Sequence, residues 1–502
     1  MNSRAFRGWL RFDQPLYRSN RHVRLLGPAA LPSGKGNTMR RPLQLAAVSP
    51  ARAVPLYNPS ASQELLTAGG GSRMIIAISR RAGYQFLVCL FISTFVVVAQ
   101  ELPSAKPESV GLSSERLERI ASKVQQEIDH KRIAGAVTLE ARHGKVAWFK
   151  AQGALDREAN KPMRDDALFR ICSMTKPITS LAVMMLYEEG RFLLEDPISK
   201  YLPEFKNPKV LVKPATGEPY TIPAAREITI RDLLTHTSGL TYNWNEDLGE
   251  RYKAANVAHG LLPYDGTIED NVKRLAGVPL LFSPGTRWEY GLSIDVLGRL
   301  VEVVSGMPLD QFFRTRIFEP LGMKDTYFFP PENKLDRLAV AYTYYPEKGL
   351  QRFPDTPITE GPTSYSADYP YRGPKRLFSG GGGLSSTAAD YLRFCQLMLQ
   401  GGKFGDLRLL SRKSVELMTH DQLGKISADQ AFGLGFGIVG VKMPLHELGS
   451  SGEFNWGGFF YTAFSIDPKE DMIVIFMAQL HPTGGLMLDG QVHELAYQAI
   501  VD

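Results

Sequence analysis

Cysteine and histidine are scarce in this chain. Its 502 residues include three cysteines, Cys89, Cys172 and Cys395, and nine histidines. Three cysteines cannot build a disulfide framework, and no two histidines stand four residues apart, as they would in a zinc-binding helix. We therefore expect Cys172 and Cys395 to be small buried residues, and we expect neither a metal nor another cofactor.

A hydrophobic run long enough to span a bilayer is also missing. The apolar stretch Phe86–Ala99 is short for a membrane helix. Arginines precede it and a small-residue cleavage site follows it, which is the pattern of a secretory signal peptide. We expect Met74–Ala99 to be removed and the protein to be secreted or periplasmic, with no stable membrane span; an uncleaved anchor is the alternative. Residues 1–73, rich in Arg, Pro, Gly and Ser, are expected to be disordered or untranslated.

Excess positive charge is confined to the start of the chain. Residues 1–81 hold 13 Lys and Arg against 2 Asp and Glu, a net of +11, so the formal charge of +6 leaves −5 for residues 82–502. The main part of the chain is therefore mildly acidic, and its charges do not form a pattern typical of a nucleic-acid surface. We expect a small-molecule partner and no nucleic acid.

One short motif that the chain does contain is Ser173-Met174-Thr175-Lys176, its only Ser-x-x-Lys. An apolar run follows, Pro177–Leu186, which predicts a buried helix ending near Gly190. Residues three apart on a helix face each other, so Lys176 can reach Ser173. Burial disfavours a charged ammonium, and a neutral amine can take the serine proton and make it a nucleophile. On its own, the motif is more typical of an ordinary helix start with a surface lysine.

Several other positions could contribute to catalysis, although none is specific alone. Tyr290 follows a Pro-Gly turn and could act as a general acid or base, but a lone tyrosine is more typical of packing. His236 is more typical of a hydrogen-bonded loop corner than of a base. The run Gly380–Gly383 lacks the Gly-Lys-Ser/Thr ending of a phosphate loop. Asn455-Trp456-Gly457-Gly458-Phe459 opens a strand where a backbone N–H could donate to an oxyanion, or where a bulge could form.

Strand patterns occur only near the two ends of the region after residue 102. A hairpin is predicted from Gly135–Ala141 and Val146–Gln152, and three strands from Gly433–Val441, Gly458–Asp467 and Met472–Ala478. Helices are predicted at both ends of the region and through most of its middle, among them one from Ser113 to about His130 and one that Ser386 caps and that runs through Gln400. The predicted fold class is α+β: a five-stranded antiparallel sheet flanked by the terminal helices, with a large inserted helical domain. The α/β part covers about 103–165 and 430–502, and the helical part about 166–429.

Taken together, these stretches resemble the serine β-lactamase and penicillin-binding-protein superfamily, and most closely its class C-like esterases, the family VIII carboxylesterases. The matching stretches occur in the family's order over most of residues 105–480: Phe169 to Lys176, Ile230 to Leu240, Pro284 to Tyr290, Ser379 to Leu384, and Trp456 to Phe460. The resemblance implies a β-lactamase-like fold.

The resemblance also implies roles for individual residues. Ser173 would be the acylated nucleophile and Lys176 its base. Tyr290 would shuttle a proton to the leaving group and activate water for deacylation. The backbone N–H groups of Ser173 and Phe459 would form the oxyanion hole.

Two departures from the family's motifs concern the substrate. Leu292 replaces the asparagine of Tyr-x-Asn, and Trp456 replaces the lysine of Lys-Thr-Gly, at the start of Trp456-Gly457-Gly458. Losing a donor and a cation while gaining apolar surface favours uncharged, hydrophobic acyl esters. We therefore expect Trp456, Gly457, Gly458 and Leu292 to contact the substrate, and we expect a serine hydrolase of short-chain carboxylic esters.

Three alternatives stay open at this point. The first is a β-lactamase or D,D-peptidase that acts on β-lactams or peptidoglycan. The second is an acyltransferase that uses an alcohol acceptor. The third is a non-catalytic sensor of cell-wall fragments on the same scaffold, which the presence of Ser173, Lys176 and Tyr290 disfavours.

Overall fold

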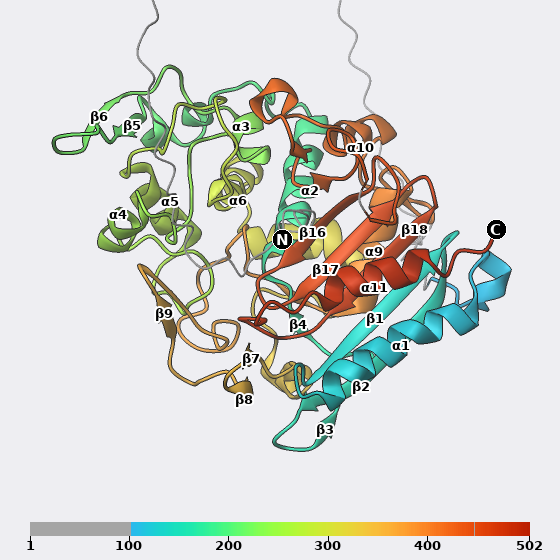
Figure 1. The fold of residues 1–502 in the computed structure, drawn as a ribbon. Coiled ribbons are helices and arrows are strands. Elements are labelled where there is room, and N and C mark those ends of the chain that lie inside the picture. Colours follow the sequence, from blue (N-terminus) through green and yellow to red (C-terminus); the bar gives the residue numbers. More distant parts are fainter. Residues whose placement is uncertain (1–101, 446) are drawn as a thin grey trace, which may run out of the picture. The chain divides into compact units, whose positions relative to one another are not determined.

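The central element of the fold is an antiparallel sheet. The structure, a computed structural model, describes residues 102–445 and 447–502; the predicted extension 1–73 and signal peptide Met74–Ala99 lie outside these residues. The strand order is β14-β15-β16-β17-β18-β1-β2-β3, and the part from β16 to β3 is labelled in Figure 1. The strands are β1 Gly135–Arg142, β2 Lys145–Asp156, β3 Lys161–Pro162, β14 Ala431–Phe432, β15 Gly437–Ile438, β16 Phe454–Gly458, β17 Thr462–Asp467 and β18 Met472–Met477.

The predicted number of five strands was wrong, because the sheet has eight. The predicted pairing between the two ends is confirmed, since β1 lies between β2 and β18. Gly458–Asp467, predicted as one strand, is instead the end of β16 and the whole of β17, with a reversal at Tyr461, whose φ is +67°. Gly433–Val441 contains only the short β15, because the chain bends at Gly435, whose φ is +96°. Both bends interrupt a hydrophobic alternation that continues through them in the sequence.

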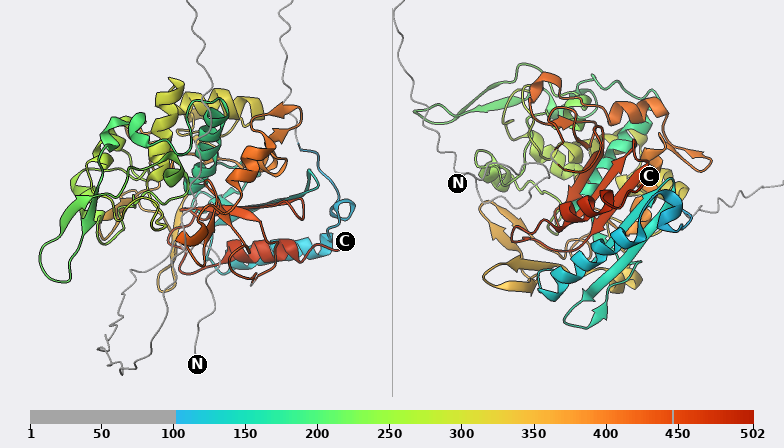
Figure 2. Two further views of the ribbon diagram at one scale, coloured as in Figure 1. Left: turned by 90° about the horizontal axis from the view of Figure 1, so that it is seen from above. Right: turned by 45° about the vertical axis from the view of Figure 1, so that its right-hand side comes forward.

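Both faces of the sheet are covered by helices. In β18, Met472, Val474 and Phe476 pack in one hydrophobic cluster with α1 (Ser114–Asp129) and α11 (Leu488–Tyr497). The alternating Ile473, Ile475 and Met477 belong to the larger cluster on the other side, with α2 (Thr175–Glu188) and α9 (Ala388–Leu399). Figure 2 shows α1 and α11 together on one side of the sheet. Each fully buried side chain of this size stabilises the fold by roughly 1.5–3 kcal/mol.

The helix ends follow local capping chemistry. The predicted helix from Ser113 to His130 is confirmed as α1, whose first turn donates from the Arg116 N–H to Ser113 Oγ. Ser386 was predicted to cap α9, but it pairs in a short strand, and Thr387 caps the helix instead. The other helices are α3 Ile230–Leu234, α4 Gly249–Ala254, α5 Ile268–Ala276, α6 Ser293–Ser305, α7 Leu309–Phe313, α8 Glu319–Leu321 and α10 Arg412–Met418.

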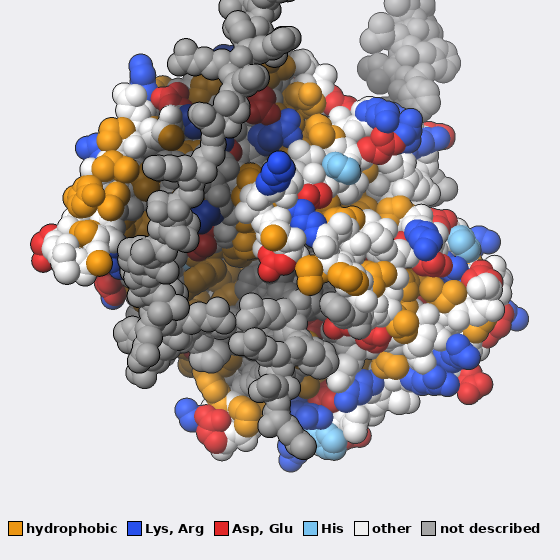
Figure 3. Space-filling model, turned by 45° about the horizontal axis from the view of Figure 1, so that its top comes forward, with side chains coloured by type: hydrophobic (Ala, Val, Ile, Leu, Met, Phe, Trp, Pro, Cys, Tyr) orange, Lys and Arg blue, Asp and Glu red, His pale blue; other side chains and the backbone are white. Residues whose placement is uncertain are grey.

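No helix within residues 102–445 and 447–502 is long and apolar enough to cross a membrane. The main sheet takes its strands from residues 135–162 and 431–477, and most helices come from the residues between them. The division into an α/β part and an inserted helical part stays a prediction. On the face in Figure 3, positive and negative side chains are interspersed.

A two-stranded ladder outside the main sheet leads to the Ser-x-x-Lys motif. β4 (Phe169–Arg170) pairs with β11 (Ser385–Ser386), and the chain continues from β4 directly into Ser173. Arg170 is 2 % exposed and its guanidinium donates to the carbonyls of Ala367 and Ala339. These bonds hold the approach to Ser173 against two distant loops.

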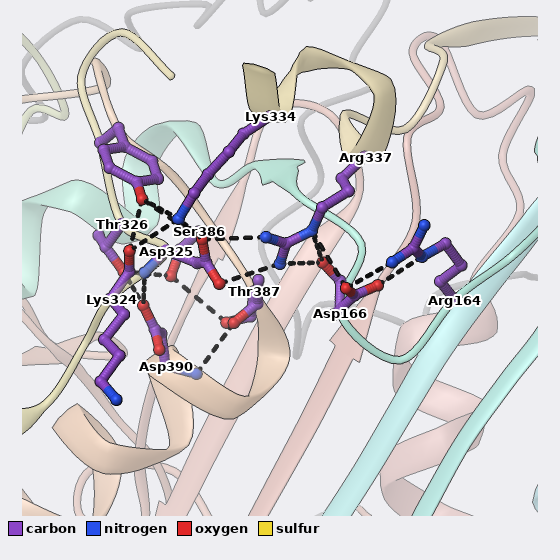
Figure 4. Close-up of polar contacts among 11 residues, drawn as sticks. Arg164, Asp166, Lys324, Asp325, Thr326, Lys334, Arg337, Ser386, Thr387 and Asp390 are labelled. Carbon is purple, nitrogen blue, oxygen red and sulfur yellow. Dashed lines mark hydrogen bonds and ion pairs between the residues drawn. The ribbon is translucent and has the colours of Figure 1, made fainter. Parts of the chain in front are cut away.

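A network of charged side chains supports the same region (Figure 4). Asp325 accepts hydrogen bonds from Lys334 and Arg337, and Arg337 also forms an ion pair with Asp166. Asp390, in the first turn of α9, accepts from Thr326 and from the backbone of Asp325. The network joins the start of α9, next to β11, to the chain before β4.

Glu140 of β1 gives a prediction for stability. This carboxyl group is 1 % exposed and has no hydrogen-bond partner among the described residues. Burial raises the pKa of Glu140 from 4.5 to about 8, against a smaller lowering by the charge of Arg142. The folded state therefore binds the Glu140 proton more tightly than the unfolded state does. The stability that this proton contributes is complete below the pKa that Glu140 has in the unfolded state, and it is lost as the pH rises through 8.

We predict that Glu140→Gln, which cannot ionise, loses less stability than the wild type between about pH 5 and about pH 9. The upper bound of the difference is roughly 5 kcal/mol. Thermal unfolding of both proteins at the two pH values measures it. An equal loss in both proteins would contradict the assignment of the proton to Glu140.

Candidate active site

Ser173 lies at a tight turn before α2. It occupies the 3₁₀ turn Cys172–Met174, and its side chain is 7 % exposed. Cys172 has a φ of +43°, a left-handed conformation that costs a non-glycine residue about 1–3 kcal/mol. The Ile171 N–H donates to the carbonyl of Leu384, which ties the turn to the segment before β11. The strained residue is therefore Cys172, and the surrounding structure holds this turn directly before the serine.

Lys176 follows one helical turn later and its amine contacts the serine. Lys176 is 1 % exposed, and its Nζ lies 3.2 Å from Ser173 Oγ. The same nitrogen lies 2.9 Å from the hydroxyl of Tyr242 and 2.6 Å from the carbonyl oxygen of Gly381. Three oxygens thus replace water around the buried amine. A neutral Lys176 in this position can take the proton of Ser173.

Tyr242 is the residue of this centre that the sequence did not single out. It is 4 % exposed, and burial, followed by the neighbouring Tyr290 and Asp295, raises its pKa well above the ordinary value. Its hydroxyl therefore stays protonated. Trp244, 37 % exposed, stacks on the Tyr242 ring at 4.1 Å between centroids. The sequence offers only an indirect signal, since Tyr242 lies two residues after the stretch Ile230 to Leu240.

Tyr290 lies on the other side of the lysine. The Lys176 Nζ is 4.6 Å from the centroid of the Tyr290 ring, and the Tyr242 and Tyr290 rings are 5.3 Å apart. A side-chain hydrogen bond between the two tyrosines contributes to the raised pKa of Tyr242. The structure thus brings the predicted residues Ser173, Lys176 and Tyr290 together. Their catalytic roles stay predictions.

His236 packs against the ring of Tyr290. Its ring lies 4.9 Å from that of Tyr290, and its Nδ1 accepts a hydrogen bond from the backbone of Gly291. Burial, followed by the positive charge of Lys176, lowers its pKa well below the ordinary value, so the imidazole is neutral. This placement fits a loop corner that orients the segment carrying Tyr290.

The strand β16 ends beside the serine turn. A Cβ atom on Gly458 would lie 2.4 Å from the carbonyl oxygen of Ile171, so only glycine allows the strand to approach this closely. Burial raises the pKa of the Cys172 thiol, and a hydrogen bond with the backbone of Phe460 acts in the opposite direction. This hydrogen bond shows that the end of β16 reaches the serine turn. The backbone N–H groups of Ser173 and Phe459 therefore belong to neighbouring segments. Their assignment as an oxyanion hole stays a prediction.

Aromatic side chains surround the site. Trp456 is 2 % exposed, and its ring centroid lies 5.4 Å from that of Tyr290. Its indole Nε1 has no hydrogen-bond partner among the described residues. Phe459 packs on Tyr365 at 4.9 Å between centroids. Cys172 packs in a separate buried cluster with Leu261, Tyr365 and Tyr369. The segments 257–266 and 358–371 therefore contribute side chains to the surroundings of the serine turn.

The predicted substrate contacts differ in their accessibility. Gly457 is partly exposed, whereas Trp456 and Gly458 are buried. Leu292 is 0 % exposed and belongs to the main hydrophobic cluster. Contact of these residues with a substrate stays a prediction. No group of three or more metal-ligating side chains is found in the part of the chain that the structure describes.

The contacts of Lys176 give a prediction for the reactivity of the serine. We predict that Lys176→Ala slows labelling of Ser173 by a fluorophosphonate about 10²–10⁴-fold, because the serine loses the amine that takes its proton. Tyr242→Phe should slow labelling less, since Lys176 keeps its contacts with Ser173 and Gly381. Mass spectrometry of the labelled peptide measures both rates, with Lys200→Ala, at an exposed ion pair with Asp196, as a control. Wild-type labelling of Lys176→Ala would reassign the base.

Comparisons with known proteins agree with this geometry. The family described as Beta-lactamase matches residues 120–497. Esterase EstB of Burkholderia gladioli is 34 % identical over 376 residues, which cover 72 % of this chain and 89 % of EstB. The lovastatin esterase of Penicillium rubens is 28 % identical over 393 residues, covering 73 % and 94 %.

A solved structure shares the fold. The structure of "EstCE1, a hydrolase with promiscuous acyltransferase activity" superposes with a TM-score of 0.66 at 29 % identity, covering 77 % of this chain and 99 % of EstCE1. The predicted β-lactamase-like fold, with mixed helices and strands, is therefore confirmed. On the family match and the similarity to EstB, the chain belongs to the Beta-lactamase family.

Proposed function

We propose that this protein is a carboxylesterase that cleaves short-chain esters through an acyl-Ser173 intermediate. The observation that carries the proposal is the 3.2 Å contact between Lys176 Nζ and Ser173 Oγ, in a site where the same amine contacts Tyr242 and lies over the ring of Tyr290. A buried amine beside a serine hydroxyl is suited to activate it as a nucleophile.

Acylation follows from these contacts. Ser173 Oγ attacks the ester carbonyl carbon while its proton moves to Lys176 Nζ. The carbonyl oxygen gains negative charge, which the N–H groups of Ser173 and Phe459 would stabilise. The bond to the alcohol oxygen then breaks, and the alcohol leaves with a proton delivered from Lys176 through a tyrosine hydroxyl.

Deacylation reverses the proton path. A water molecule loses a proton to the tyrosine–lysine pair and attacks the acyl carbon. The bond to Ser173 Oγ breaks, and the serine recovers its proton as the carboxylic acid is released. Tyr290, predicted for this role, and Tyr242, which directly contacts the amine, form the relay together.

The substrate class follows from the surroundings of the serine. Trp456 stands where the family's Lys-Thr-Gly motif has a cation and packs against Tyr290, and the partly exposed Phe459 adds aromatic surface three residues later. Such a surface favours uncharged, apolar acyl groups over carboxylate-bearing antibiotics. The names of EstB and of the lovastatin esterase support the same reaction class.

Acyl transfer to an alcohol is a second candidate activity. It would use the same acyl-Ser173, with an alcohol in place of water. EstCE1, a hydrolase that also has promiscuous acyltransferase activity, supports this candidate. Secretion through removal of Met74–Ala99 likewise remains a proposal, supported by the arrangement of basic, apolar and small residues in that segment.

The role of Ser173 gives the first functional prediction. Ser173→Ala should abolish hydrolysis of p-nitrophenyl butyrate, because no acyl-enzyme can form. Tyr290→Phe should lower kcat by about 10²–10⁴-fold, as expected for a lost acid/base group. Release of p-nitrophenol measures both. Retained turnover by Ser173→Ala would refute the proposed nucleophile.

The aromatic surroundings give a prediction for selectivity. The wild type should have a higher kcat/KM on p-nitrophenyl butyrate than on nitrocefin, because the site has Trp456 in place of a cation for the carboxylate. The two substrates are compared at one pH and one enzyme concentration. A preference for nitrocefin would instead favour the β-lactamase alternative.

A further inference from the structure

The glycine run Gly380–Gly383 threads between two helices of the active site. A Cβ atom on Gly380 would lie 2.8 Å from the carbonyl oxygen of Ile294 in α6. On the other side, Thr179 of α2 donates to the Gly380 carbonyl at 2.7 Å. A side chain on Gly380 or Gly381 would therefore collide with α6, whereas a Cβ atom on Gly382 would meet no atom closer than 4.0 Å.

Asp295 of α6 holds this segment from one side. Asp295 is 1 % exposed, and its Oδ1 accepts a hydrogen bond from Ser379 Oγ at 2.6 Å. Its Oδ2 lies so close to Gly381 that a Cβ atom there would be 2.3 Å away. From the opposite side, the Gly381 carbonyl accepts the 2.6 Å hydrogen bond from Lys176 Nζ. A single residue thus separates a buried carboxyl group from the buried amine.

The charge balance around Lys176 also involves Asp295. Within the described residues, no carboxylate forms an ion pair with Lys176, although the amine becomes an ammonium when it takes the serine proton. The titratable groups that face or act on Lys176 are Cys172, His236, Tyr242, Tyr290 and Asp295. Burial raises the pKa values of Cys172 and Tyr242 and lowers that of His236, so all three stay neutral.

Among the titratable groups named around Lys176, Asp295 is the one with a carboxyl group. Burial is the largest effect and raises the pKa of Asp295, while the Ser379 hydroxyl, the charge of Lys176 and the backbone of Gly381 act in the opposite direction. An ammonium formed on Lys176 during the reaction favours the ionised form of a carboxyl group that lies on the other side of Gly381.

We propose that Asp295 is a positioning residue: through Ser379 and Gly381 it fixes the carbonyl that binds Lys176, and its negative charge balances the ammonium formed during acylation. This inference rests on the proposed esterase function. The proton moves from Ser173 Oγ to Lys176 Nζ and then to the leaving alcohol, so Asp295 exchanges no proton. It touches neither the substrate nor the reacting atoms.

The test compares two buried carboxyl groups. Asp295→Asn keeps the size of the side chain and removes its charge. Asp467→Asn does the same at the end of β17 remote from Gly458, where Asp467 is 1 % exposed and accepts a hydrogen bond from Tyr497 of α11. The readouts are kcat and KM for p-nitrophenyl butyrate across a pH range, with the thermal unfolding midpoint measured in parallel.

Asp295→Asn should lower kcat about 10²-fold with little change in KM, because the amine is held less accurately. The acidic limb of its pH profile should move to lower pH, because an ammonium without a nearby negative charge gives up its proton more easily. Asp467→Asn should keep the wild-type kcat and pH profile, whatever its unfolding midpoint. A wild-type kcat and profile in Asp295→Asn, even with reduced stability, would overturn the proposal.

A second variant keeps the test decisive if Asp295→Asn does not fold. Ser379→Ala removes the hydroxyl that donates to Asp295, so it should lower kcat at unchanged KM; a wild-type kcat in it would overturn the proposal. Failure of the proposed function is distinguishable, since a wild type without ester hydrolysis would contradict the function itself. An active wild type and inactive Ser173→Ala, with normal Asp295→Asn and Ser379→Ala, would overturn only the role of Asp295.

Discussion

The buried amine of Lys176 is surrounded by oxygen atoms of the protein, and the fold of the site positions these atoms. Its three oxygen partners come from three separate segments: Ser173 from the turn before α2, Tyr242 from the loop after α3, and Gly381 from the glycine run. Each partner is supplied by a different part of the tertiary structure. The amine is therefore held by oxygen atoms of a serine, a tyrosine and a backbone carbonyl, and no carboxylate of the described residues is in direct contact with it.

Helix α6 and the turn before it join the two sides of the centre. Tyr290 packs on Lys176 just before the helix begins, and Asp295 in its first turn supports the residue that binds the same amine. His236 supports Tyr290 as a neutral ring. Aromatic side chains therefore fill the space around the serine, and in our proposal the carboxyl group of Asp295 balances the charge of Lys176. This separation suits a hydrolase of neutral substrates.

Much of the site could be predicted from the sequence because its motifs are local. Ser173 and Lys176 are one helical turn apart, and the glycines before Phe459 mark a close backbone approach in any fold. Tyr242 and Asp295 could not be identified in this way. Their importance comes from distances to Lys176 that only tertiary packing creates, and neither residue belongs to a local pattern that indicates catalysis.

The sheet shows the same limit. The pairing of the N-terminal hairpin with the C-terminal strands could be predicted, because neither set buries its apolar residues alone. The additional strands could not, since β3, β14 and β15 have two residues each and exist through their neighbours. The reversal at Tyr461 was missed because hydrophobic residues continue through it on both sides.

The close contact of Gly458 with Ile171 has a consequence for the order in which the protein acquires reactivity. The serine turn is synthesised early, whereas β16, which completes the site beside it, comes close to the end of the chain. A partly made chain contains Ser173 and Lys176 without Phe459, the second of the two predicted oxyanion donors. The predicted oxyanion site is therefore complete only when the late strand β16 has joined the sheet beside the serine turn.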